Sequence, residues 1–120
     1  MAFPFYIGTY TTQNGAEGIY EATFDPQRCR FSDLRLAART QNPSYLAMAA
    51  DRYLLAVNEL SEYEGRAEGA VTLFKREKEN LVCSDQTGSG GRHPCYVSTS
   101  CNDCVVAVAN YSSGSCSWFE

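Results

Sequence analysis

The sequence lacks several features that would assign it to a common functional class. Its 120 residues contain one histidine and no run of lysine or arginine, and the formal net charge is −4. This charge pattern disfavours binding to nucleic acid or to an anionic membrane surface. No apolar run approaches the roughly 18 residues that a membrane-spanning helix needs. Residues 1–7 lack the basic and long apolar regions of a signal peptide, so a cytoplasmic location is expected.

Familiar catalytic and metal-binding motifs are also missing. No Gly-x-Ser-x-Gly sequence is present, which argues against a serine-hydrolase triad. The glycine-rich residues 88–91 lack the Lys-Ser/Thr pair of a phosphate-binding loop. Cys101 and Cys104 have the spacing of a zinc knuckle, but no second Cys or His pair follows them. The sequence therefore predicts no metal site and no cofactor.

Six cysteines are present, but without a secretory signal they do not indicate a disulfide framework. Cys83, Cys95 and Cys116 lie within apolar strand patterns. Free cysteine behaves as a small apolar residue in such positions. We therefore predict that these three thiols are buried in the core.

What the sequence does contain is a series of short strand patterns with regular turn signals and no helical period. This combination predicts an all-β, antiparallel structure. The predicted strands are residues 3–10, 18–24, 31–38, 45–49, 53–59, 69–74, 81–86, 95–100, 105–111 and 115–119. The connections include polar loops and short turns, among them a charged turn predicted at residues 75–80.

An internal repeat organises these strands. Asn42-Pro-x-Tyr45 recurs as His93-Pro-x-Tyr96, and the Asn58 that ends the next strand recurs as Asn110. The offset is 51 residues from 42 to 93 and 52 residues from 58 to 110, so one residue is gained at the intervening turn. A period of about 20–50 residues is typical of solenoids and propellers.

The repeat predicts one domain over residues 1–120, an incomplete β-propeller built of antiparallel four-stranded blades. Blade 1 covers about residues 3–40, blade 2 about 42–88 and blade 3 about 92–120. If the strands of a blade are lettered A to D from the inside out, the chain reads B-C-D, A-B-C-D, A-B-C. The first blade therefore lacks its A strand and the third lacks its D strand.

This topology places the candidate functional residues at one end of the blades. Because A and B strands are antiparallel, the start of each A strand lies beside the end of the B strand. The A strand is innermost, so its first residues border the central channel. Asp51 and Asn102, in the A-to-B turns, are predicted at the opposite end. The predicted catalytic residues are His93 and Glu59, and the predicted substrate-binding residues are Arg92, Asn110, Tyr111 and Asn58.

Such a set suits the hydrolysis of an activated ester. His93 or Glu59 can take a proton from water, while Arg92, Asn110 or Tyr111 can hold an oxyanion or an anionic substrate. A structural interpretation stays open. His-Pro and Asn-Pro can cap a turn, and asparagine at the end of a strand can bond the backbone.

The order and spacing of several short motifs resemble the seven-bladed β-propeller lactonases, the 6-phosphogluconolactonase-like proteins related to fungal muconate-lactonizing enzymes. The resemblance covers about two and a half blades of that fold, at its N-terminal end. The motifs are Tyr6-Ile-Gly-Thr-Tyr10, Gly18-Ile-Tyr20, Asn42-Pro-Ser-Tyr45, Ala56-Val-Asn-Glu59, Gly69-Ala-Val71, His93-Pro-Cys95 and Ala109-Asn-Tyr-Ser112.

This resemblance implies cofactor-independent hydrolysis of a small-molecule sugar lactone, such as 6-phosphogluconolactone to 6-phosphogluconate in the pentose phosphate pathway. It also implies that the chain is a fragment or a short form of the enzyme. Two positions depart from the family. Members often carry His where this chain has Tyr96, and Cys29 and Cys104 stand at turn positions that usually hold Gly, where a positive φ is expected.

The alternative to an enzyme is a non-catalytic β-sheet module that binds a ligand or partner. An array of two to three blades leaves open strand edges at both ends, and open edges invite pairing with another chain. The same argument predicts self-association of the chain.

Overall fold

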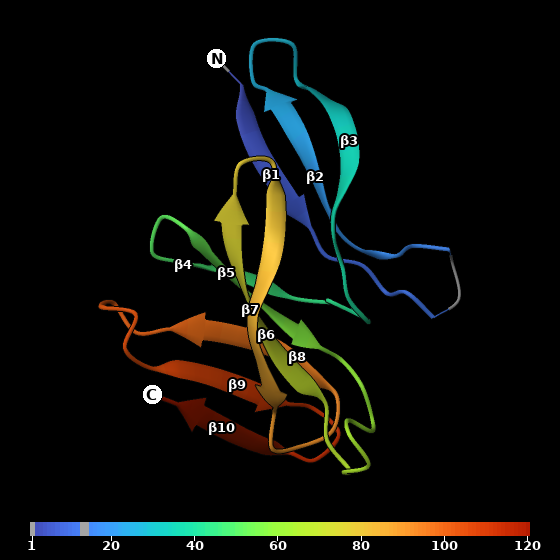
Figure 1. Cartoon of the computed structure of the whole chain (residues 1–120), viewed down its shortest axis with the longest axis vertical. Helices are drawn as coiled ribbons and strands as arrows, with labels where there is room; N and C mark the ends of the chain where they lie inside the picture. The colour runs from blue at the N-terminus through green and yellow to red at the C-terminus, as the bar shows by residue number, and fades with distance from the viewer. Residues whose placement is uncertain (1, 13–14) are drawn as a thin grey trace.

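The structure, a computed structural model, describes residues 2–12 and 15–120 as ten antiparallel strands (Figure 1). They are β1 (Phe3–Ile7), β2 (Gly18–Asp25), β3 (Arg30–Arg39), β4 (Leu46–Ala49), β5 (Tyr53–Asn58), β6 (Ala70–Glu77), β7 (Asn80–Gly88), β8 (Pro94–Thr99), β9 (Val106–Asn110) and β10 (Ser115–Phe119). Among these residues no helix occurs, and so none that could span a membrane.

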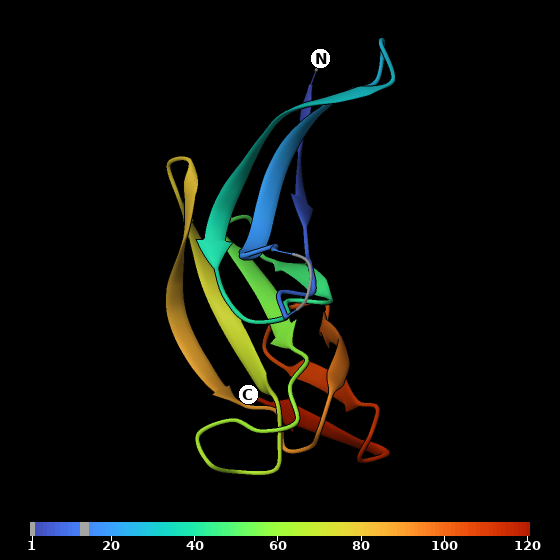
Figure 2. The ribbon, with the colours of Figure 1, turned by 90° about the vertical axis from the view of Figure 1, so that its right-hand side faces the viewer.

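The strands form three sheets in which each strand pairs with its neighbour in sequence. Their orders are β1-β2-β3, β4-β5-β6-β7 and β8-β9-β10. The first sheet projects beyond the other two, and the second sheet lies between the first and the third (Figures 1 and 2). Antiparallel sheets of three or four strands confirm the all-β prediction of an incomplete propeller.

The central strand β5 joins the three sheets through its alternating side chains. Leu54 and Ala56 contribute to one core cluster with Ile19 of the first sheet. Leu55 and Val57 contribute to a second cluster with residues of the third sheet, including Val108. Since successive side chains of a strand point to opposite faces, a continuous apolar run is the expected sequence for a strand covered on both faces.

The register confirms the residue gained within the repeat. In the second sheet Ala49 pairs with Tyr53, so residues 50–52 form the turn. In the third sheet the Ser100 amide donates to the Val105 carbonyl at 2.9 Å, so residues 101–104 form it. The two turns contact each other, because the Ala50 amide donates to Asp103 Oδ2 at 2.9 Å.

Two predicted strand ends are wrong by three residues, and the others lie within two residues of the observed ends. The first strand ends at Ile7 rather than at residue 10, and a Cβ on the next residue, Gly8, would lie 2.1 Å from the Pro43 carbonyl oxygen. Pairing of β1 with β2 ends at Ile7, and the backbone at Gly8 lies close to the loop that leads into the second sheet. The strand predicted at 69–74 continues to Glu77, which pairs with Asn80. Lys78 adopts a φ of 55°, so two residues suffice for this hairpin turn.

The predicted burial of three cysteine side chains differs from the structure. Cys83 and Cys116 are exposed and Cys95 is only half-buried, so the prediction of three core thiols is wrong. Cys83 and Cys116 lie on β7 and β10, which are edge strands of their sheets and have a neighbour on one side only.

The positive φ expected at two turn cysteines is found at one of them. Cys29 has a φ of 49°. At the other turn the positive φ belongs to Asp103 (55°) and not to Cys104.

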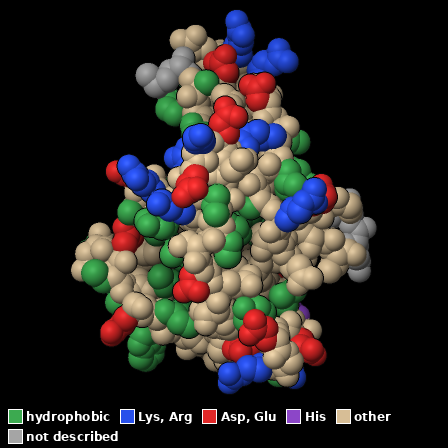
Figure 3. Space-filling view, in the orientation of Figure 1, with side chains coloured by type: hydrophobic (Ala, Val, Ile, Leu, Met, Phe, Trp, Pro, Cys, Tyr) green, Lys and Arg blue, Asp and Glu red, His purple; other side chains and the backbone are tan. Residues whose placement is uncertain are grey.

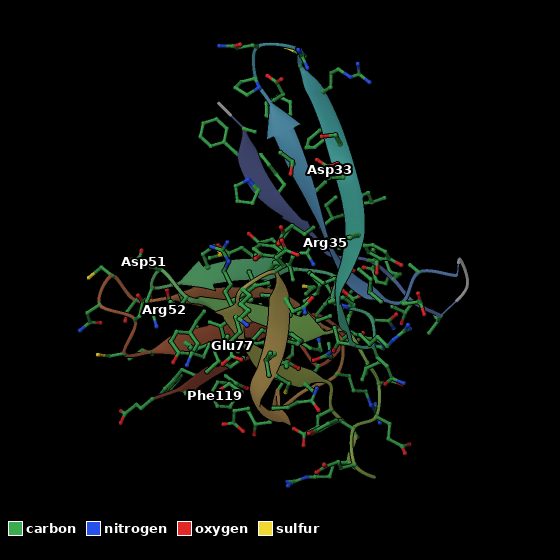
Figure 4. All side chains as sticks on the ribbon, turned by 45° about the horizontal axis from the view of Figure 1, so that its top comes forward. Asp33, Arg35, Asp51, Arg52, Glu77 and Phe119 are labelled. Atoms are coloured by element: carbon green, nitrogen blue, oxygen red, sulfur yellow. The ribbon has the colours of Figure 1, made fainter. Side chains whose placement is uncertain are left out.

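Polar contacts also join the sheets. Arg35 lies on β3 (Figure 4). Its guanidinium lies 3.2 Å from Glu21 Oε1 and donates to Asn80 Oδ1 of the second sheet at 3.5 Å. The guanidinium carbon of Arg76 lies 5.7 Å from the centre of the Tyr6 ring. On the face drawn in Figure 3, acidic and basic side chains are interspersed rather than gathered by sign.

We expect Leu54→Ala to lower the free energy of unfolding by about 2–5 kcal/mol, because it removes a fully buried side chain between two sheets. Met48 pairs with Leu54 in the ladder but is 47% exposed. Met48→Ala should therefore cost about 1 kcal/mol or less. Urea denaturation of both variants measures the difference, and equal losses would contradict the core assigned to β5.

Candidate functional site

One end of the sheets gathers the loops that carry the candidate residues. We call this end the rim; it comprises residues 8–12, 40–45, 59–69, 89–93 and 111–114. Backbone hydrogen bonds connect its loops: the His93 amide donates to the Leu60 carbonyl at 2.9 Å, and the Tyr111 amide donates to the His93 carbonyl at 3.0 Å. The joined turns at Ala50 and Asp103 lie at the opposite ends of their strands.

His93 is half-buried and has a φ of 53°. Its repeat equivalent, Asn42, also precedes a proline and has a φ of 42°. Because the left-handed backbone occurs in both units, it belongs to the repeat and is not a strain peculiar to the histidine. The His93 ring lies 2.7 Å, through Nδ1, from the Ser112 hydroxyl oxygen. No hydrogen bond to Nε2 is found among residues 2–12 and 15–120.

Asn42 ties the first sheet to the second. Its Oδ1 accepts hydrogen bonds from the Thr11 amide at 2.8 Å and the Thr11 hydroxyl at 3.1 Å, and its Nδ2 donates to the Glu59 carbonyl at 3.2 Å. The asparagine of the Asn-Pro motif therefore has a structural role, the alternative that the sequence left open: it connects two neighbouring loops by hydrogen bonds. At the equivalent position, His93 places an imidazole instead.

Glu59 is half-buried and has two hydroxyl neighbours. The Ser44 hydroxyl donates to Glu59 Oε1 at 3.2 Å. A hydrogen bond from the Tyr10 hydroxyl to the Glu59 carboxylate raises the pKa of Tyr10, with a smaller contribution from burial. The carboxylate therefore accepts the single hydrogen of the Tyr10 hydroxyl and stabilises its neutral form.

The carboxamides of Asn58 and Asn110 point into the sheets rather than toward solvent. Both residues are buried, at 1% and 2% exposed. Asn58 Nδ2 donates to the Gln41 carbonyl at 2.6 Å, and Asn110 Nδ2 donates to the Ser89 carbonyl at 3.1 Å. These bonds favour the structural interpretation of both asparagines, and their predicted substrate contacts stay predictions.

Arg92 and Tyr111 differ from the asparagines because both are exposed. The Arg92 amide donates to the Ser113 hydroxyl at 2.8 Å, which fixes the backbone and leaves the side chain outside the sheet. No ion pair of Arg92 is found within the described part of the chain. Tyr111 is 80% exposed. Arg92 precedes His93 in the sequence, and the Tyr111 amide bonds to the His93 carbonyl, so a guanidinium and a phenol lie near His93 at the surface of the rim.

A pair of aromatic side chains beside the rim was not predicted as part of the site. The rings of Tyr45 and Tyr96, equivalent residues of neighbouring units, lie 4.6 Å apart at an interplanar angle of 38°. Desolvation, and then a hydrogen bond with Tyr96, raises the pKa of Tyr45. Both tyrosines belong to the repeated Pro-x-Tyr motif, and this recurrence was the feature of the sequence that could have indicated the pair. Ser44 and Ser112 were likewise missed, since hydroxyl groups near strand ends are common.

The structure brings the predicted catalytic residues onto adjoining loops without joining their side chains. His93 contacts Ser112, Glu59 contacts Ser44 and Tyr10, and no contact between the imidazole and the carboxylate appears among the described residues. Within residues 2–12 and 15–120 there is also no cluster of three metal-ligating side chains. The arrangement offers an imidazole, a carboxylate and a cation on the adjoining loops of the rim.

Comparison with known families identifies the fold. Residues 4–120 match the family described as lactonase, 7-bladed β-propeller. The chain belongs to this lactonase family. The match confirms the resemblance inferred from the short motifs, and it covers all three sheets.

Known proteins of the family are similar to this lactonase chain over most of its length. The 6-phosphogluconolactonase of Bacillus subtilis is 32% identical over 111 residues, which are 91% of this chain and 30% of that protein. The crystal structure of a candidate 6-phosphogluconolactonase of Bacteroides uniformis has a TM-score of 0.85 at 31% identity, covering 98% of this chain and 33% of that one. The periplasmic gluconolactonase of Pseudomonas aeruginosa has a TM-score of 0.81 at 32% identity, covering 92% and 31%.

The chain thus spans about a third of the length of these relatives. In a seven-bladed propeller the remaining blades also border the central channel.

We expect the backbone at residue 93 to accept asparagine with little loss, because Asn42 adopts the same conformation in the preceding unit. His93→Asn should change the free energy of unfolding by no more than about 0.5 kcal/mol. His93→Val should lower it by about 1–3 kcal/mol, since a β-branched residue is strained at positive φ. Chemical denaturation compares the two, and equal stability would contradict the left-handed backbone assigned to residue 93.

Proposed function

We propose that the rim is part of the active site of a sugar-lactone hydrolase, with 6-phosphogluconolactone as the substrate and 6-phosphogluconate as the product. Membership of the lactonase family carries this proposal, and the position of His93 and Glu59 at the rim supports it. The three sheets serve as blades over about residues 3–40, 42–88 and 92–120. No cofactor takes part in the proposed reaction.

The proposed reaction needs a base, an anion-binding group and a proton donor. His93 accepts a proton from water at Nε2 as the water oxygen adds to the lactone carbonyl carbon. The bond from that carbon to the ring oxygen then breaks, and the ring oxygen takes the proton held at His93 Nε2 to become a hydroxyl group. The new carboxylic acid ionises. Arg92 binds the substrate phosphate, and Glu59 accepts the hydrogen bond of the Tyr10 hydroxyl, which joins these two side chains at the rim.

The cellular setting of this reaction is a separate proposal. The pentose phosphate pathway consumes 6-phosphogluconolactone in the cytoplasm, which agrees with the location expected from the N-terminal residues. One relative is named a periplasmic gluconolactonase, so family membership alone does not fix the compartment.

We expect His93→Asn to lower kcat/KM for gluconolactone hydrolysis by about 10²–10⁴-fold, because it removes the proton acceptor and keeps the backbone conformation. Asn102→Ala, in the turn at the opposite end, should leave kcat/KM unchanged. The rate of acid release from the lactone measures both. If the unsubstituted chain turns over no faster than His93→Asn, the non-catalytic module becomes the better interpretation.

Self-association is the second proposed property, and the first sheet offers the surface for it. Phe5, Phe24 and Phe31 form a cluster with ring centres 4.9–5.8 Å apart. An apolar pocket of about 510 Å³ adjoins it, lined by residues that include Phe5, Phe31 and Leu34. Leu34 is 67% exposed and Phe31 is 59% exposed. We propose that a second copy of the chain covers this aromatic face beside the open edge of β1.

We expect the chain to form dimers or larger species at micromolar concentration, and Leu34→Glu to shift it toward monomer. A carboxylate on the aromatic face would lose hydration on contact with a second copy. Glu120→Gln, away from the first sheet, is the matched control. Sedimentation velocity measures the distribution, and a monomer at all concentrations before substitution would contradict the proposal.

A further inference from the structure

A hydrogen bond between two side chains holds the histidine ring at the rim. His93 Nδ1 lies 2.7 Å from the Ser112 hydroxyl oxygen, at the short end of the range for a bond between nitrogen and oxygen. His93 is half-buried and Ser112 is exposed. The contact connects the residue before β8 to the loop after β9, and the reaction described above gives Ser112 no role.

The backbone holds both partners of this contact in place. The Tyr111 amide donates to the His93 carbonyl at 3.0 Å. The Arg92 amide donates to the Ser113 hydroxyl oxygen at 2.8 Å. The residues before and after Ser112 are therefore both bonded to the segment that carries the imidazole, which limits how far the hydroxyl can move from the ring.

The internal repeat offers a comparison in which both partners are replaced. Asn42 stands in place of His93, 51 residues earlier, and Leu60 stands in place of Ser112, 52 residues earlier. The backbone bond is kept, since the Glu59 amide donates to the Asn42 carbonyl at 3.0 Å. A leucine side chain has no hydrogen-bonding group. Imidazole and hydroxyl therefore occur together in the third unit, on a backbone that requires neither of them.

The proposed reaction sets the direction of this hydrogen bond. A neutral imidazole carries one N–H group, so a ring that accepts a proton at Nε2 must carry its first proton at Nδ1. After Nε2 has accepted the proton, both ring nitrogens are donors, and Nδ1 needs an acceptor in either state. A hydroxyl oxygen has two lone pairs and can accept this bond. The bond is stronger when the donor is charged, so it favours the state in which His93 holds the proton taken from water.

We propose that Ser112 is a positioning residue for the base. Its hydroxyl oxygen accepts a hydrogen bond from His93 Nδ1–H, which keeps the ring in the tautomer that has a lone pair at Nε2. The Nδ1 proton stays in place throughout the reaction, and only the proton at Nε2 is taken up and released. Ser112 itself forms no bond to the substrate. This inference rests on the proposed lactone hydrolysis and adds to it the residue that orients the base.

The test reads the state of the ring directly, because His93 is the only histidine of the chain. Nitrogen-15 NMR at about pH 9, above the usual titration range of histidine, distinguishes a protonated from an unprotonated ring nitrogen. We expect the proton at Nδ1 in the unsubstituted chain and in Ser112→Thr, which keeps a hydroxyl group at this position. In Ser112→Ala both nitrogen signals should shift toward the exchange-averaged values of free histidine.

The kinetics of gluconolactone hydrolysis give a second measurement. Ser112→Ala should lower kcat by about 10- to 100-fold and leave KM within about twofold, because Ser112 orients the base and does not bind the substrate. Ser112→Thr should restore most of kcat. Ser84→Ala, an exposed serine on β7, is the matched control and should change neither constant. Urea denaturation of each variant separates a loss of orientation from a loss of fold.

Three results would overturn this role of Ser112. One is a proton at Nε2 in the unsubstituted chain, which would make the serine the donor. Another is the same pair of ring signals in Ser112→Ala as in the unsubstituted chain. The third is an unchanged kcat in Ser112→Ala when the unsubstituted chain is active. A chain that has the expected ring signals but hydrolyses no lactone would contradict the proposed function alone, so the two failures are distinguishable.

Discussion

The structure depends on β5 being covered on both faces. Its side chains alternate between two core clusters, so the first and third sheets are both held to the second by the same six-residue strand. Polar contacts such as the one between Arg35 and Asn80 lie outside these clusters and add comparatively little, because exposed polar pairs contribute about 0–1 kcal/mol. The position of every rim loop follows from this packing.

The sequence was sufficient to predict the strands and their grouping because local patterns and the repeat agreed. Alternation, turn residues and a recurring Pro-x-Tyr motif all indicate the same units. The failures occurred where neighbours in space decide the outcome. Cys83 and Cys116 have the pattern of core residues, yet their strands have no partner on one side. Glu77 continues its strand because Asn80 pairs with it across a two-residue turn.

The sequence predicts where the candidate residues lie in the fold, but not the direction in which their side chains point. Strand order alone locates His93 and Glu59 at one end of the sheets. It does not show that Asn58 and Asn110 turn inward, since that depends on partners such as Thr72 on the adjacent strand. Nor does it show that Tyr45 and Tyr96 touch, because the contact depends on the spacing between two sheets.

The paired positions 42 and 93 separate what the backbone requires from what the side chain does. Both precede a proline in a left-handed conformation, and in both the main chain bonds the neighbouring loop. Asn42 connects two sheets by side-chain hydrogen bonds, whereas His93 places an ionisable ring at the same position. A reactive group can therefore be moved from one blade to the next by a single codon change, with no rearrangement of the strands beneath it. Repetition of the blade gives the fold spare positions for new chemistry.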